Sequence, residues 1–99
     1  MALHCGKNTI NAAGPVHGFG VGPTAANAKQ AAMGMAHGFA NAVAAARAAG
    51  MKCPALECPK LVGPIVANEK TTELVSVKLK PQLYLSVVRR QFDVVIFCQ

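Results

Sequence analysis

Charge is scarce in this chain of 99 residues. Asp, Glu, Lys and Arg make up 14% of the residues, whereas about 25% is usual in soluble domains. Only four residues are acidic, and no two of them form an obvious close pair. Hydrolysis by two paired carboxylates therefore has no support. No Ser-His-Asp context stands out either, so an enzyme is the least favoured class of function.

The chain also lacks the patterns of secreted and membrane proteins. Its amino terminus has no charged start followed by an apolar block, as a secretory signal would. The longest apolar stretch, residues 31–49, consists mainly of alanine and contains His37, Asn41 and Arg47. Such a stretch is a poor membrane span, because alanine contributes little hydrophobicity and the polar residues oppose insertion. We therefore expect a cytoplasmic protein without a membrane span.

Aromatic residues that could stack on bases are few, namely one Tyr and four Phe. The net charge is nevertheless +6, and no run of five or six basic residues occurs. A basic balance permits binding to nucleic acid without setting specificity. A basic nucleic-acid-binding module is therefore the second hypothesis. Its phosphate contacts would come from Lys29, Lys78, Lys80, Arg89 and Arg90.

Hydrophobic residues are abundant and make up 53% of the chain. A protein surface with so little charge is more stable when it is buried against other copies of the chain or against partner proteins than when it is exposed to water. The length predicts a single domain over residues 1–99. The first hypothesis is therefore a non-catalytic protein that acts through self-association or as a small subunit of a larger assembly.

One long alanine-rich helix is predicted between Thr24, a suitable N-cap, and Gly50, a suitable C-terminal glycine. Met35, Phe39 and Val43 recur every fourth residue and predict its bulky stripe. Glycines and alanine form a flat strip elsewhere on the helix, with one histidine beside it. This strip predicts either a contact of the helix with its own sheet or an interface between copies. The residues concerned are Gly34, Gly38, Ala42 and His37.

The other segments read as strands. Residues 2–10 and 16–21 predict a hairpin turned at 11–15, and residues 61–67 and 71–80 predict a second one turned at 68–70. Residues 82–91 fit either a helix or a strand, residues 92–98 predict a buried strand, and a break is expected near 89–91. The fold class is α+β, with the helix packed on a mostly antiparallel sheet of four or five strands.

The glycine-rich stretch before the helix matches neither the dinucleotide fingerprint nor a Walker loop. Its glycines predict close packing, and the free N–H groups of the first helical turn, with Thr24 and Lys29, predict a weak anion site. Residues 20–29, GVGPTAANAK, also resemble the glycine turn and helix start of double-stranded RNA-binding domains. That resemblance implies RNA contacts at the helix start, although Ala25 and Ala26 replace two lysines of the family pattern.

Four cysteines complete the set of candidate sites: Cys5, Cys53, Cys58 and Cys98. Buried free thiols, one or two disulfides, and a structural zinc ion are three alternatives. The third hypothesis is therefore a small zinc- or disulfide-stabilised module centred on Cys53 and Cys58. No other cofactor is expected.

Overall fold

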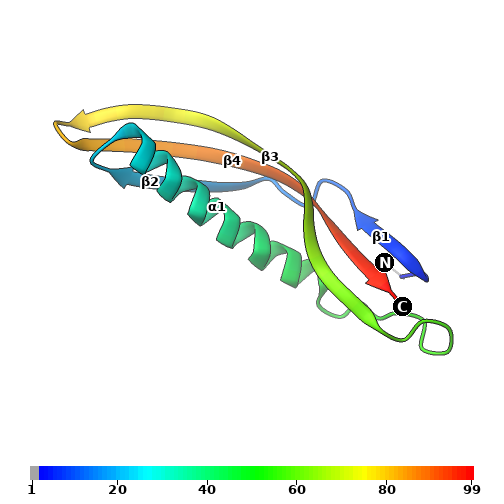
Figure 1. Cartoon of the computed structure of the whole chain (residues 1–99). Coiled ribbons are helices and arrows are strands. Elements are labelled where there is room, and N and C mark those ends of the chain that lie inside the picture. The colour runs from blue at the N-terminus through cyan, green and yellow to red at the C-terminus, as the bar shows by residue number, and fades with distance from the viewer. Residues whose placement is uncertain (1–2) are drawn as a thin grey trace.

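The computed structural model describes residues 3–99. It confirms the predicted α+β class, with one helix packed against a four-stranded antiparallel sheet (Figure 1). The molecule is elongated, with extents of 62 × 16 × 16 Å. Its elements are β1 (Gly6–Ile10), β2 (Val16–Gly22), α1 (Ala25–Ala48), β3 (Leu61–Lys80) and β4 (Leu83–Cys98).

The sheet is built around β4. The long strand β3 pairs along one side of β4, while β1 and β2 share its other side, β1 near the carboxyl end and β2 near the start. Both predicted hairpins are therefore corrected: β1 and β2 each pair with β4, and residues 61–80 form one strand. Residues 83–98 also run without the expected break. The predicted turn at Asn68 is a β-bulge instead, where a left-handed residue (φ 52°) absorbs extra chain length.

The helix lies on one face of the sheet in unusually close contact with β2. Its start is capped as predicted, because the Thr24 Oγ accepts a hydrogen bond from the Asn27 N–H at 3.1 Å. A Cβ atom at Gly20 would lie 2.5 Å from the Ala28 carbonyl oxygen, and one at Gly18 would also collide with helix backbone. The glycines thus serve close packing, as predicted.

The stripe of the helix that faces the sheet consists entirely of alanine. Its members are Ala28, Ala32, Ala36, Ala40 and Ala44. The bulky residues Met35, Phe39 and Val43 lie outside this buried stripe and are only partly covered. The physical reason is the glycines of β2, since a backbone at that distance leaves room for methyl groups only.

Two hydrophobic clusters lie between helix and sheet. The larger one is under the second half of α1 and includes Phe92, Val94 and Ile96. The smaller one, under the first half, contains Val88 with two alanines. Arg90, 7% exposed, lies on the same face of β4 between Val88 and Phe92 and thus separates the clusters. Among the residues that the structure describes, no helix is both long and apolar enough to cross a membrane.

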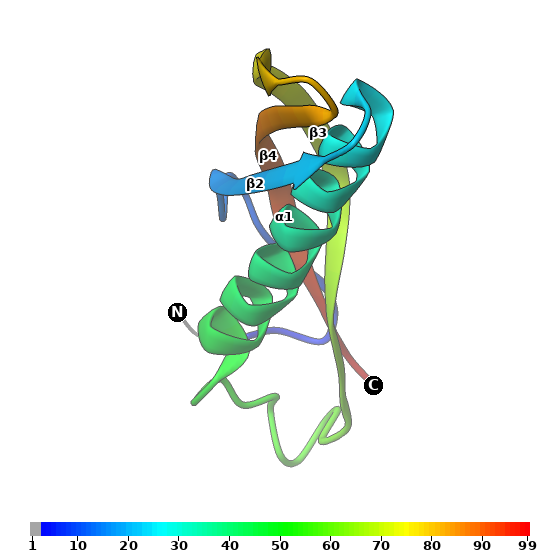
Figure 2. The same ribbon diagram turned by 90° about the vertical axis from the view of Figure 1, so that its left-hand side faces the viewer.

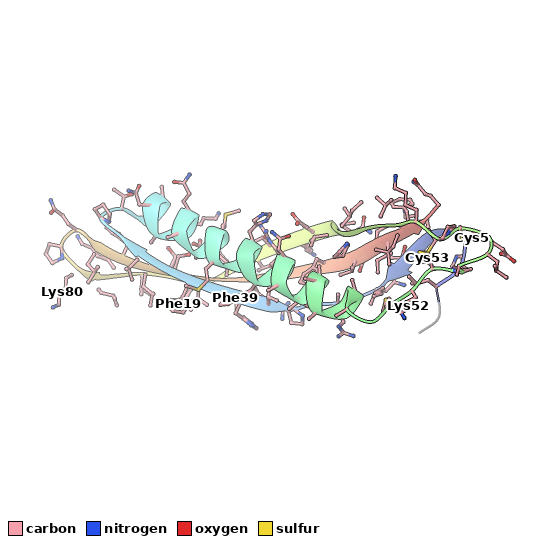
Figure 3. The ribbon with its side chains drawn as sticks, turned by 90° about the horizontal axis from the view of Figure 1, so that it is seen from below. Cys5, Phe19, Phe39, Lys52, Cys53 and Lys80 are labelled. Atoms are coloured by element: carbon pink, nitrogen blue, oxygen red, sulfur yellow. A yellow bond between two sulfur atoms is a disulfide. The ribbon has the colours of Figure 1, made fainter. Side chains whose placement is uncertain are left out.

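Two disulfides hold the end of the molecule where β1, the loop after α1 and the end of β4 meet. They join Cys5 to Cys58 and Cys53 to Cys98. The described cysteines therefore include no free thiol. Cys53 and Cys58 are thus each joined to a cysteine near one terminus and are not joined to each other. Figure 3 shows these disulfides and Lys80 at opposite ends of the molecule.

Candidate interaction surface

The sheet has one covered and one open face. Along β4 the even-numbered side chains from Ser86 to Cys98 are buried toward the helix, and the odd-numbered ones point to the other side. Within residues 3–99, α1 is the only helix, and Figure 2 shows it on one side of the sheet. The opposite face is therefore left uncovered along β2 and the adjoining parts of β3 and β4.

This open face carries an apolar patch of six side chains, which we call the open-face patch. The strand register arranges them in two rows across β2, β4 and β3. Exposure reaches 60% for Phe19 and 55% for Val21, values unusual for large apolar side chains. One row consists of Phe19, Val87 and Val75, and the other of Val21, Leu85 and Val77.

The open-face patch contains no charge, and its two ends are basic. Arg89 lies in the next row between His17 and Thr72, and its Nε atom is buried without a hydrogen-bond partner. Lys80, opposite Leu83, lies at the other end. The carboxylate of Glu73 belongs to the covered face, where it accepts a hydrogen bond from the Ser86 hydroxyl at 2.6 Å. The patch is thus an apolar surface without an acidic group.

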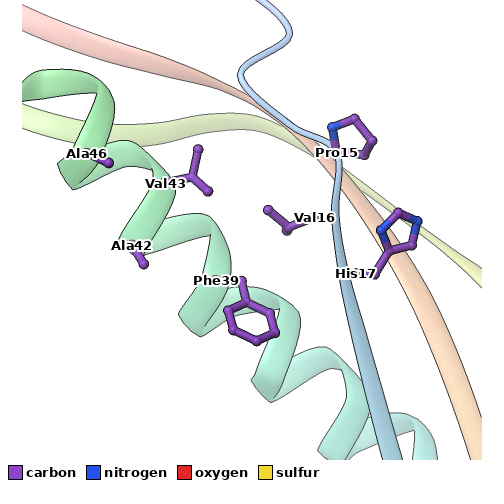
Figure 4. A pocket seen from close by; sticks show the side chains of 7 residues that line it. All are labelled: Pro15, Val16, His17, Phe39, Ala42, Val43 and Ala46. Atoms are coloured by element: carbon purple, nitrogen blue, oxygen red, sulfur yellow. The ribbon is translucent and has the colours of Figure 1, made fainter.

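A shallow groove of about 440 Å³ lies beside the patch, between α1 and β2 (Figure 4). Met35 reaches from the helix over the edge of β2, where its sulfur accepts a hydrogen bond from the Phe19 N–H at 3.5 Å. His17 is the one polar side chain in the lining, so the groove lacks the converging polar groups of a small-molecule site. It is lined by Pro15, Val16, His17, Phe39, Ala42, Val43 and Ala46.

A second cleft, of about 530 Å³, lies where β1 ends and β3 bulges. Asp93 is its acidic residue. One carboxylate oxygen accepts a hydrogen bond from the Ala12 N–H and the other accepts one from the Asn68 side-chain amide, both at 2.9 Å. These two donors, the Ala12 N–H first, lower the pKa of Asp93 from its usual value. Both oxygens are engaged within the chain, so Asp93 joins the 11–15 connection to the β3 bulge.

The predicted basic residues do not form one surface. Arg89 and Lys80 lie on the open face, whereas Lys78 and Arg90 belong to the covered face. The Lys78 ammonium lies 6.0 Å from the centre of the Tyr84 ring, within reach of a cation–π contact. Lys29 is exposed on the first turns of α1. Because β4 is a strand, its side chains alternate between the two faces, so Arg89 and Arg90 point to opposite sides of the sheet. The sequence had not decided between helix and strand for this segment.

His37 and Arg90 bind each other across the helix–sheet contact. The Arg90 Nη1 donates a hydrogen bond to the His37 Nδ1 at 3.2 Å, and its Nε donates one to the Thr71 hydroxyl at 3.0 Å. The Asn41 amide lies 3.2 Å from the other ring nitrogen of His37. His37 therefore connects α1 to β4 and is already engaged within the chain.

The glycine strip of the helix faces outward. A Cβ atom at Gly34 or Gly38 would have no neighbouring atom within 4 Å. The interpretation of the strip as the contact between helix and sheet is therefore wrong, since alanines make that contact. Ala42 lines the groove beside β2. An interface between copies at this strip stays a prediction.

The cysteines, as disulfides, offer no thiolate to a metal ion. Among residues 3–99 no three His, Cys, Asp or Glu side chains are grouped as metal ligands. Comparison of the chain with protein-family models, with curated proteins and with solved structures finds no match. The open-face patch is the feature that the sequence did not reveal. The alternation of apolar and polar residues in 71–80 indicated that Val75 and Val77 share a face of the strand, but not which face of the sheet the helix leaves uncovered.

Proposed function

We propose that this protein is a non-catalytic association module whose binding surface is the open-face patch. The observation that supports the proposal is the pair of registered rows, in which six apolar side chains lie on a sheet face that no helix within residues 3–99 covers. Packing against a partner would remove these side chains from water, and this is the main driving force of protein association. The scarcity of charge in the whole chain supports the same function.

The size of the patch agrees with this proposal. The exposed fractions of its six side chains correspond to roughly 400 Å² of apolar surface. Contiguous apolar patches of about 300–600 Å² are the largest that a typical monomer exposes, and they are often functional. The patch is also built on three paired strands, so its shape is defined before any partner binds.

The two disulfides favour an oxidising compartment for this association, in place of the cytoplasm that the sequence predicts. Disulfides persist where thiols are not kept reduced, and they help small domains with modest cores. The protein should therefore be produced and studied in its oxidised form.

Native mass spectrometry of the untagged, oxidised protein tests the proposal. We expect an assembly of fixed stoichiometry, and we expect Val77→Lys to dissolve it, because a lysine there would bury an unpaired charge. Gly34→Leu is the matched variant on the outward helix strip and should leave the assembly intact. A wild-type protein that stays monomeric throughout the micromolar range and binds no vesicles containing phosphatidylserine would contradict the proposal. Dissolution by Gly34→Leu alone would move the interface to α1.

A further inference from the structure

We infer that the occupant of the open-face patch is a second copy of this chain, packed face to face with its strands antiparallel to those of the first. This inference rests on the proposed function and specifies the partner. The dimer would have four layers, with the two sheets about 10 Å apart in the middle and one α1 helix on each outer side.

The available area fits a stable homodimer. Two copies together offer roughly 800 Å² of apolar surface from the six side chains of each patch. Apolar atoms make up about 56–65% of protein interfaces, so this corresponds to a total buried area of roughly 1,300 Å². Specific interfaces bury about 1,200–2,000 Å². A face-to-face contact therefore reaches the required size when the polar atoms around the two patches are buried together with the apolar side chains.

The two rows make the patch self-complementary. A two-fold axis in the plane of the interface, perpendicular to the strands and level with Ser86, places each row over the other row of the second copy. Phe19 then lies over Val21 of the second copy, and Val75 over Val77 of the second copy. Every contact between the rows is apolar, with an aromatic ring against a smaller β-branched side chain on the β2 side.

Direct stacking of like charges disfavours the parallel arrangement, whereas the antiparallel one places Arg89 over Leu83 of the second copy, with Lys80 of that copy one strand away. A parallel dimer would stack Arg89 on Arg89 of the second copy. In the antiparallel dimer each Arg89 lies three residues from the axis, so the two guanidinium groups are roughly 20 Å apart. This separation exceeds the Debye length of about 8 Å at physiological salt, which screens their repulsion.

An anionic membrane is the competing occupant, and the charges of the open face argue against it. The strand register assigns Lys80 and Arg89 to the rows next to the patch, and Lys70 and Lys7 to the same face farther along β4, opposite Gln91 and Phe97. Segments that bind anionic lipids typically use about 4–8 such residues close together. Only Lys80 and Arg89 lie next to the patch, which is fewer than such a segment uses, whereas apolar contact with a second copy needs no basic side chain.

A charge-swap experiment tests the second copy and its register together. Val75→Lys and Val77→Glu are each expected to lose the dimer in sedimentation velocity, because their homodimers would bury two unpaired charges. Mixing the two variants should restore a dimer, since the antiparallel register places position 75 over position 77 of the other copy. Mixing Val75→Lys with Val75→Glu should restore little, because these positions do not face each other. Leu56→Lys, at a fully exposed position on the disulfide-bonded loop, is the control for added charge.

The outcomes separate this inference from the proposed function. A wild-type dimer, lost in each single variant and restored only by the 75/77 mixture, supports both. Restoration by the 75/75 mixture, or a wild-type ring or filament, overturns the antiparallel dimer and leaves the surface proposal standing. A monomer that binds vesicles containing phosphatidylserine through Phe19, tested with Phe19→Ser, also overturns the second copy alone. A monomer that binds no such vesicles overturns both. Circular dichroism and intact mass verify the fold and disulfides of each variant.

Discussion

Replacing Gly18 by alanine should destabilise the protein strongly, because the added methyl group has no space. Its Cβ would overlap the carbonyl oxygen of Ala32 and lie 2.7 Å from the backbone nitrogen of Ala36. These are atoms of the helix backbone, so no side-chain rotation can relieve the overlap. The helix as a whole has to move away from β2, which loosens the contacts of the alanine stripe on either side.

The expected loss follows from overpacking. Inserting a methylene group into a packed core destabilises by about 1–3 kcal/mol and occasionally more, and a clash with backbone belongs to the upper end of that range. We expect a loss of about 3 kcal/mol, after a gain of roughly 0.4–1 kcal/mol from the lower entropy of the unfolded chain is included. For a domain of this size that corresponds to a melting temperature lower by at least roughly 12 °C.

Urea unfolding followed by circular dichroism on the oxidised protein measures this loss. The matched control is Gly34→Ala, a substitution in the same helix–sheet unit at a position with open space around it. It should stabilise the helix by roughly 1 kcal/mol, because glycine is a poor residue in a helix interior. If Gly18→Ala proves as stable as the wild type, α1 does not lie on β2 as described. The covered and open faces of the sheet would then have to be reassigned.

Three further predictions concern other parts of the molecule. Replacing Cys53 and Cys98 by serine should lower the free energy of unfolding by about 4 kcal/mol, the value that the chain-entropy model gives for a sequence separation of 45 residues. Urea unfolding measures this loss, and an unchanged midpoint would contradict a stabilising role of the Cys53–Cys98 disulfide. Asp93 has a lowered pKa in the folded state, so its contribution to stability is complete above about pH 4 and is lost as the pH falls through the lowered value. The stability difference between wild type and Asp93→Asn should therefore shrink in acid, and a difference independent of pH would refute this role. We expect no detectable binding of the wild type to RNA or DNA, because Lys78 and Lys80 belong to opposite faces of the sheet, and the double variant Lys78→Glu, Lys80→Glu should behave in the same way. Salt-dependent binding by the wild type that the variant loses would restore the nucleic-acid hypothesis.

The sequence predicted those elements whose signals are local. Thr24 and Gly50 mark the two ends of the helix, because capping depends on the residue itself and its nearest backbone. Alternating apolar and polar residues likewise predicted the strand over 71–80, whereas residues 82–91 were left open between helix and strand. The expected strands and the single helix together predicted the α+β class. Gly18 and Gly20 indicated close packing, since a strand with glycines gains stability only when something packs against its backbone.

The rest depended on pairing between distant residues. Asn68 suits a turn as well as a bulge, and only the continuous pairing of β3 with β4 decides between them. Four cysteines allow three pairings, and the fold selects the one that brings Cys5 to Cys58 and Cys53 to Cys98. The buried stripe of the helix was misassigned because bulk usually marks the core, whereas here the glycines of the facing strand require alanine.

The open-face patch was invisible in the sequence for a related reason. Phe19 and Val77 lie in strands whose alternation is readable, but each strand has two faces. Which face the helix covers follows from the register of β2 and β3 on β4. Once that register is known, the uncovered side chains and their arrangement in two rows follow directly.

Concentration-dependent carbene footprinting, read by mass spectrometry, can locate the binding surface of this protein, because it reports which side chains association removes from water. We expect labelling at Phe19 and Val77 to fall as the protein concentration rises, while labelling at Phe39 and along the outward helix strip stays constant. The opposite pattern, with an unchanged sheet face and a protected helix strip, would contradict the assignment of the open face as the binding surface.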